Sequence, residues 1–85
     1  MRRRGRVDIN QAAIVEALRS VGWKVVSLSS NGGGLPDLLI ARGYELRLIE
    51  VKQPKGKLTE DQERFIYRDQ WPVTILRSVE EALEL

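Results

Sequence analysis

The chain has 85 residues, of which 42% are hydrophobic and 31% are charged. This length predicts one small domain, and the composition excludes a disordered tail. The chain contains no cysteine and no histidine, which excludes disulfides, zinc sites built on these residues, thiol nucleophiles and histidine acid–base chemistry. No apolar run approaches the roughly 18 residues of a membrane span, so we expect no membrane partner.

The formal net charge of +2 is unevenly distributed. Residues 1–57 carry 11 Lys or Arg against 5 Asp or Glu, whereas residues 58–85 carry 3 against 7. The basic first part favours a polyanionic partner, nucleic acid first, and a solvated surface is the alternative. The basic N-terminus has no apolar stretch behind it, so it is no secretory signal, and we expect a cytoplasmic protein. The candidates for phosphate contacts are Arg2, Arg3, Arg4, Arg6, Lys55 and Lys57.

The first predicted helix begins at Asp8, after a basic, flexible arm formed by residues 1–7. Asp8 and Gln11 have the spacing of a capping box. Gly22 is a suitable stop signal after the helix. One helical face carries apolar residues at the spacing i, i+3, i+4 and i+7, namely Ile14, Ala17, Leu18 and Val21. Residues 8–85 are therefore expected to form the single domain.

Three strands are predicted next, at residues 23–28, 37–41 and 45–51. A glycine-rich loop precedes the second strand, but it is no phosphate-binding P-loop, because no Gly-Lys-Ser/Thr ending and no helix follow it. The second and third strands form a hairpin, since Gly43 stands at the first central position of a two-residue type II′ turn.

The last third of the chain is predicted to contain two helices and a strand. Thr59 and Gln62 form a capping box that opens a helix to about Asp69. Residues 73–76 form a short strand, and Ser78 caps a final turn of helix. The order α-β-β-β-α-β-α predicts an α/β fold in which helices flank one sheet. We interpret the large aromatic side chains as core or interface residues: Trp23, Phe65, Tyr67 and Trp71.

The register of the hairpin brings two carboxylates together. If Gly43 and Tyr44 form the turn, the numbers of paired residues sum to 87, and Asp37 lies directly opposite Glu50. Directly opposed residues have Cβ atoms about 4.5–5.5 Å apart, where like charges repel, so we expect a cation between them. The lack of His and Cys favours a hard cation with oxygen ligands, Mg²⁺ or Mn²⁺.

Lys52 shares the strand face of Glu50, because side chains alternate, and it lies roughly 7 Å further along. Its amine can neutralise the carboxylate pair, orient an attacking water or stabilise charge that develops on a phosphate. Two carboxylates and a lysine on one face form a workable site for metal-dependent phosphodiester hydrolysis. The alternative is a surface ion-pair cluster on the hairpin.

These residues carry a family resemblance. Pro36-Asp37, followed thirteen positions later by Glu50-Val51-Lys52, resembles the signature of the PD-(D/E)xK nuclease superfamily. The surrounding segments, residues 34–40, 49–52 and 56–62, are similar to those of its VRR-NUC branch, the virus-type replication-repair nucleases. The likeness spans about residues 8–76. It implies a restriction-endonuclease-like αβββαβ core, with a central mixed sheet flanked by helices and a short C-terminal helix.

The resemblance also implies a role for each residue of the motif. Asp37 and Glu50 would bind Mg²⁺ or Mn²⁺ together with the backbone carbonyl of Val51. Lys52 would position the attacking water or stabilise the transition state. Gln62 matches a glutamine that supports water or substrate in the family, and its capping box is the other explanation for it.

The family places a further acidic residue in the first helix, where it assists the metal. Asp8 is the nearest candidate in this chain, and Glu16 is the next. Their alternative roles are a helix cap for Asp8 and a solvated helix face for Glu16.

The predicted function is a divalent-metal-dependent DNA endonuclease without an organic cofactor. So short a chain has little surface for reading bases, so we expect it to recognise backbone charge and DNA shape. The small core favours a twofold homodimer, whose two active sites would make paired, symmetric cuts. Stand-alone members of the family resemble junction-resolving enzymes, so four-way (Holliday) junctions are the first candidate among the DNA substrates. The resemblance also implies DNA recombination or repair, and a phage protein acting in the host cytoplasm.

Three alternatives stay open. A nuclease for flaps or nicked duplexes would use the same site. A nucleic-acid-binding module on the same fold would bind junctions without cleaving them. In an assembly subunit the carboxylates would pair with arginines, and Asp37→Asn would then destabilise the fold.

Overall fold

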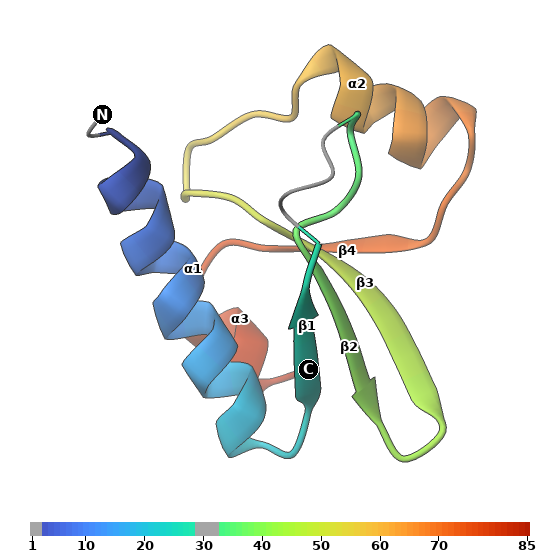
Figure 1. The fold of residues 1–85 in the computed structure, drawn as a ribbon. Coiled ribbons are helices and arrows are strands. Elements are labelled where there is room, and N and C mark those ends of the chain that lie inside the picture. Colours follow the sequence, from blue (N-terminus) through green and yellow to red (C-terminus); the bar gives the residue numbers. More distant parts are fainter. Residues whose placement is uncertain (1–2, 29–32) are drawn as a thin grey trace.

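A computed structural model describes the backbone of residues 3–28 and 33–85, with side chains from Asn10 onward. Its centre is one sheet of four strands in the order β1-β2-β3-β4 (Figure 1). The strands are β1 (Lys24–Ser27), β2 (Leu38–Arg42), β3 (Glu45–Val51) and β4 (Val73–Leu76). The first three run antiparallel, whereas β4 lies parallel to β3. The predicted mixed sheet flanked by helices is confirmed.

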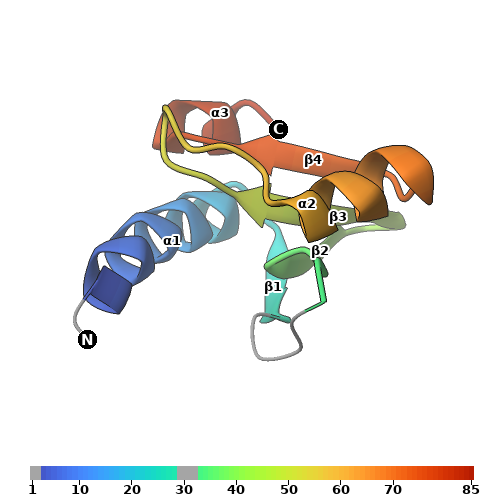
Figure 2. The same ribbon diagram turned by 90° about the horizontal axis from the view of Figure 1, so that it is seen from above.

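The helices lie on opposite sides of this sheet. Helix α1 (Arg3–Ser20) packs on one face together with the short C-terminal helix α3 (Val79–Leu83). Helix α2 (Glu60–Glu63) continues into a π-helical turn, η1 (Arg64–Arg68), on the other side. Figures 1 and 2 show the sheet between α1 and α2. Among the described residues, no helix combines the length and the apolar composition that crossing a bilayer requires.

The core fills the space between the sheet and α1. Ile14 and Leu18 of α1 are fully buried, as their helical spacing predicts. They meet alternate residues of the strands, because every second side chain points to the same face. The buried strand residues of this face are Leu38, Ile40, Ile49, Val51 and Leu76. Ala82 of α3 closes the same cluster.

Helix α1 starts earlier than the sequence predicted. It begins at Arg3, so Asp8 lies inside the helix, and the predicted cap at Asp8 is wrong. Arginine is a good helix former, and no proline separates Arg3 from Asp8, so the helix extends past the capping pattern. The division into an arm of residues 1–7 and a domain of residues 8–85 stays a prediction, and side chains before Asn10 lie outside the described part.

The turns and the other helix caps agree with the predictions from the sequence. Gly22 ends α1 with a φ of +97°. Gly43 has a φ of +62°, whereas Tyr44 is not among the described residues of positive φ, which fits the predicted type II′ turn. Thr59 and Gln62 form the predicted capping box of α2, and the Ser78 side chain caps α3.

Candidate active site

The two predicted carboxylates face each other at the C-terminal end of β3. The observed register pairs Leu38 with Ile49 and Arg42 with Glu45, so pair numbers sum to 87 as predicted. Asp37 directly precedes β2, and the same register places it opposite Glu50. Its Oδ2 accepts a hydrogen bond of 2.9 Å from the Val51 amide, which fixes the carboxylate against the third strand.

The carboxyl group of Glu50 is held inside the protein. It is only 3% exposed. Its Oε2 accepts a hydrogen bond of 2.9 Å from Gln62 Nε2 and lies 3.7 Å from Lys52 Nζ. Burial, and next the Asp37 carboxylate, raise the pKa of Glu50 to about 7 from a usual 4.5, and the Lys52 ammonium offsets part of this rise. A cation between the carboxylates would lower the pKa of Glu50 again, because an opposite charge nearby favours the ionised form.

Gln62 serves the helix and the site at the same time. Its backbone amide donates to Thr59 Oγ1, and its side-chain Oε1 accepts from the Thr59 amide at 2.9 Å. The remaining side-chain nitrogen reaches Glu50. The two interpretations offered for this residue are therefore compatible, because one amide group can satisfy both partners.

The donor set fits a hard divalent cation. Asp37 and Glu50 supply carboxylate oxygens, and Mg²⁺ usually binds one or two carboxylates while it keeps several waters. Among the described side chains, no three His, Cys, Asp or Glu residues come together to hold a metal. Further ligands would have to be main-chain oxygens or waters, and the Val51 carbonyl stays a prediction of this kind.

Helix α1 approaches the site through Asn10, a residue that the sequence analysis missed. Asn10 Nδ2 donates to the Lys52 carbonyl at 3.4 Å. Asn10 also lines a small cavity of about 200 Å³ together with Lys52 and Lys57. Glu16 is exposed and lies six residues further along α1, about 240° around the helix from Asn10. The structure therefore does not bring Glu16 to Glu50, and the Asp8 side chain lies outside the described part.

Arg77 organises the loop that follows Lys52. Its Nη1 donates to the carbonyls of Gln53 at 2.8 Å and Gly56 at 2.7 Å, and more weakly to Pro54 at 3.4 Å. Lys55 and Lys57 of this loop are exposed, so the loop presents two ammonium groups beside the site. No local pattern in the sequence signals this contact, because Arg77 lies more than 20 residues away from its partners.

Gly34 brings the segment before Asp37 against the start of α2. Its φ is +83°, and a Cβ atom at this position would lie 2.5 Å from the Asp61 carbonyl oxygen. The close approach therefore requires glycine. Gly34 thus shapes the edge of the site beside Asp37.

The N-terminal arginines are only partly described. Arg3, Arg4 and Arg6 belong to α1, and their side chains lie outside the described part. Arg2 lies outside the described residues altogether. Their contacts with phosphates stay a prediction.

The fold and the site together define the class of this domain. A sheet that opposes Asp37 and Glu50 beside Lys52 is the framework of a nuclease of the PD-(D/E)xK type. Comparison with known protein families matches residues 4–76 to the VRR-NUC domain. The chain belongs to this family, and the predicted resemblance is confirmed. Nucleases of this family act on DNA and generally use divalent metals. No curated protein and no solved structure gives a significant match.

Proposed function

We propose that this protein is a Mg²⁺-dependent endodeoxyribonuclease that resolves four-way DNA junctions as a symmetric homodimer. The observation that carries the nuclease activity is the buried Glu50, opposed to Asp37 and in contact with Lys52 and Gln62. Burying a carboxylate next to another one is unfavourable, and a cation bound between them would offset this cost.

Each residue of the site has a distinct task. Asp37, Glu50 and the Val51 carbonyl would hold the cation, which supplies an activated water and neutralises charge on the phosphate. Lys52 carries a positive charge on the same face and would stabilise the charge that develops on the scissile phosphate. Gln62 holds Glu50 in one orientation through a hydrogen bond to its carboxylate.

DNA binding would depend on backbone charge rather than on base sequence. Lys55 and Lys57 are exposed on the loop after Lys52, and Arg2, Arg3, Arg4 and Arg6 would extend this basic surface. Such contacts position DNA without reading its bases. The homodimer and the junction are supported by the small size of the domain and by the need for paired cuts in a symmetric substrate. Junction resolution in turn would place the protein in DNA recombination or repair, in the cytoplasm of a phage-infected host.

The test is cleavage of a labelled four-way junction, a matched duplex and a single strand, each with Mg²⁺, Mn²⁺ or EDTA. We expect paired, symmetric cuts in the junction alone, and their loss with EDTA. Lys52→Ala, purified in parallel, controls for a contaminating nuclease and should be inactive.

Other outcomes of this experiment would support one of the alternative functions. Cutting of every substrate, or of flaps and nicked duplexes first, would keep the metal site and remove the junction preference. A folded protein that binds junctions but cuts nothing with either metal would be a binding module, and the proposed activity would be wrong.

A further inference from the structure

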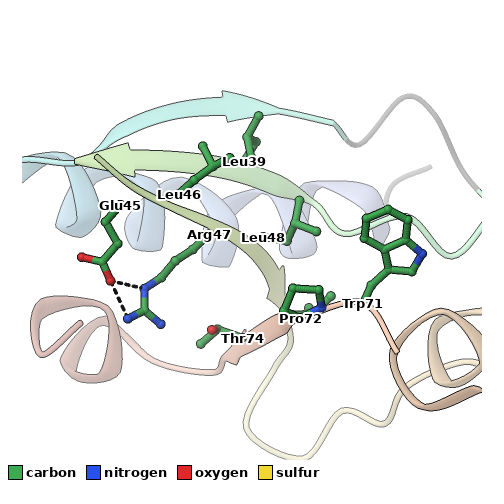
Figure 3. A pocket seen from close by; sticks show the side chains of 9 residues that line it. Leu39, Glu45, Leu46, Arg47, Leu48, Trp71, Pro72 and Thr74 are labelled. Atoms are coloured by element: carbon green, nitrogen blue, oxygen red, sulfur yellow. Dashed lines mark hydrogen bonds and ion pairs between the residues drawn. The ribbon is translucent and has the colours of Figure 1, made fainter. Parts of the chain in front are cut away.

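An apolar hollow lies beside β3 and the start of β4. Its volume of about 660 Å³ is typical of sites for small ligands. The apolar residues that line it are Leu39, Leu46, Leu48, Trp71, Pro72 and Val73. Figure 3 shows Leu48 and Trp71 at one end of the hollow and the Glu45–Arg47 ion pair at the other. A cavity with an apolar lining and a few polar groups is a candidate binding site.

Trp71 forms one flat side of this hollow. Its ring stacks on Phe65, with the ring centroids 5.3 Å apart and the planes 9° from parallel. The Trp71 amide also donates to the Phe65 carbonyl at 3.2 Å. Phe65 covers one face of the indole, yet Trp71 is still 51% exposed, so Trp71 is not a core residue. An aromatic ring that is held in place and borders an open hollow is suited to stacking on a planar ligand.

The hollow and the candidate active site lie on the same face of β3. Leu48 lines the hollow, and Glu50 follows on the same strand face, about 7 Å further along. The helical segment formed by α2 and η1 reaches both places. Gln62 donates to Glu50, and Phe65, three residues later on the same side of the segment, stacks on Trp71. A ligand in the hollow would therefore lie beside a phosphate bound at Glu50.

The backbone of Leu46 adds polar groups to the apolar hollow. Arg42 and Glu45 flank a two-residue turn and form a hydrogen-bonded pair, so Leu46 directs its amide and carbonyl away from β2. On that side, within the described part of the chain, β4 pairs with β3 only from Leu48 onward. Pro72 precedes β4 and has no N–H group that could donate to the Leu46 carbonyl. Leu46 therefore offers one donor and one acceptor to a ligand in the hollow.

We propose that this hollow accepts one unpaired nucleobase of the DNA, which stacks on Trp71 beside the phosphate that is cut. The inference deepens the proposed function and rests on it for the DNA substrate. A nucleobase has a flat face for the indole, and its edge carries donors and acceptors for the Leu46 backbone. Turning a base out of a duplex is least costly where the base is already unpaired. The hollow would therefore favour branched DNA with displaced bases over a continuous duplex.

Fluorescence titration in EDTA tests base stacking without any cleavage. The probe is a short single-stranded oligothymidylate, and an abasic strand of the same length measures the contribution of the phosphates. Of the two tryptophans, Trp23 is buried, so quenching of the indole fluorescence by DNA would come from Trp71. We expect the oligothymidylate to quench this fluorescence and to bind about 10-fold more tightly than the abasic strand.

Variants of Trp71 separate stacking from apolar contact, and anisotropy of a labelled strand measures their affinities. Trp71→Leu keeps an apolar side chain without the flat ring. It should bind the oligothymidylate about 10-fold more weakly and the abasic strand as before, which also shows that it folds. Trp71→Phe should keep most of the affinity, because its ring can still stack. Tyr67→Leu is the matched control, since Tyr67 is an exposed aromatic residue of η1 outside the described lining of the hollow, and it should bind both strands normally.

Two results would overturn the inference and leave the nuclease activity untouched. If the abasic strand binds as tightly as the oligothymidylate, DNA is held by its phosphates alone, and no base enters the hollow. If Trp71→Leu binds the oligothymidylate like the unchanged protein, no base stacks on Trp71. Conversely, base-dependent binding that requires Trp71, in a protein that cuts no DNA with Mg²⁺, would support the nucleobase site and show that the proposed activity is wrong.

Discussion

The two faces of one sheet have opposite characters in this protein. The face toward α1 and α3 is covered, and its strand residues Leu38, Ile40 and Ile49 are almost fully buried. The other face carries Glu50 at one end of β3 and the exposed Leu46 at the other end. Alternate residues of the same strands therefore either stabilise the fold or remain available for chemistry and association.

This division shows how a chain of 85 residues accommodates the candidate site. The covered face supplies the apolar burial, so the other face can tolerate an unfavourable carboxylate pair. A buried charge costs stability unless it is paired. In β3 this group is Glu50, which lies between the core residues Ile49 and Val51. Four predictions follow the contrast between the faces, beginning with the largest effect.

Replacing Glu50 with Gln should remove activity without harming the fold. The variant keeps the size of the side chain but loses a metal ligand, so we expect DNA cleavage with Mg²⁺ to slow by about 10³-fold or more. The rate of junction cleavage and the unfolding midpoint measure the two effects. Glu80→Gln makes the same chemical change at an exposed position of α3 and should cleave normally. An active Glu50→Gln protein would remove this carboxylate from the mechanism.

Replacing Ile40 with Ala should lower the stability of the fold without removing activity. Ile40 is fully buried on the covered face, and truncation of such a side chain costs about 2–5 kcal/mol of unfolding free energy. Urea unfolding measures this loss, and the cleavage rate per folded molecule should stay the same. Val26→Ala, on the open face of neighbouring β1 and 57% exposed, should cost less than about 1 kcal/mol. Equal costs for the two variants would contradict the contrast between the faces.

The metal-free protein should lose stability as the pH rises from about 4.5 to about 7. The folded state raises the pKa of Glu50 to about 7 from 4.5, so within this range the folded state binds more protons than the unfolded state. The unfolding free energy then falls with increasing pH, by about 1–3 kcal/mol in total. Unfolding in EDTA at several pH values measures the slope.

Two controls sharpen this result. Glu50→Gln should flatten the slope over the same range, because an amide does not titrate. Mg²⁺ at pH 8 should restore stability to the unchanged protein and not to the variant, since a ligand that binds only the folded state stabilises it. A rise in stability between pH 4.5 and 7 that depends on Glu50 would show that its pKa is lowered instead.

Replacing Arg77 with Gln should have the smallest effect. The guanidinium holds the loop of residues 53–56 through its carbonyls, and a shorter neutral amide cannot reach all of them. We expect the KM for DNA to rise by about 10-fold with little change in kcat, because the loop would position phosphates rather than react. Arg68→Gln, at a more exposed arginine, serves as the control. A fall in kcat with an unchanged KM would assign Arg77 to the chemical step.

The hairpin register and the capping box around the candidate site were predicted correctly, because both depend on local geometry. The turn at Gly43 fixes the hairpin register, and the two-residue period of a strand then fixes the positions of Asp37, Glu50 and Lys52. The capping box of Thr59 and Gln62 is equally local, since its partners are three residues apart. Such patterns need no knowledge of the rest of the molecule.

The parts that were missed depend on contacts between distant segments. Asn10 reaches Lys52 across 42 residues, and Arg77 reaches Gln53 across 24. The rotation of α1 over the sheet decides which of its residues approaches Lys52, and it follows from packing of the whole core. The start of α1 was missed for another reason, because Asp8 and Gln11 have the same spacing inside a helix as at its beginning.

The side chain of Gln62 makes the first turn of α2 and the carboxylate of Glu50 a single cooperative unit. Its oxygen accepts from the Thr59 backbone, so the amide cannot rotate without breaking the cap, and its nitrogen is thereby aimed at Glu50. Fraying of the helix start would release the carboxylate, and a change at the carboxylate would loosen the helix start. Hydrogen exchange of the Gln62 and Glu63 amides would therefore report the occupancy of the site from its periphery, before any DNA is cut.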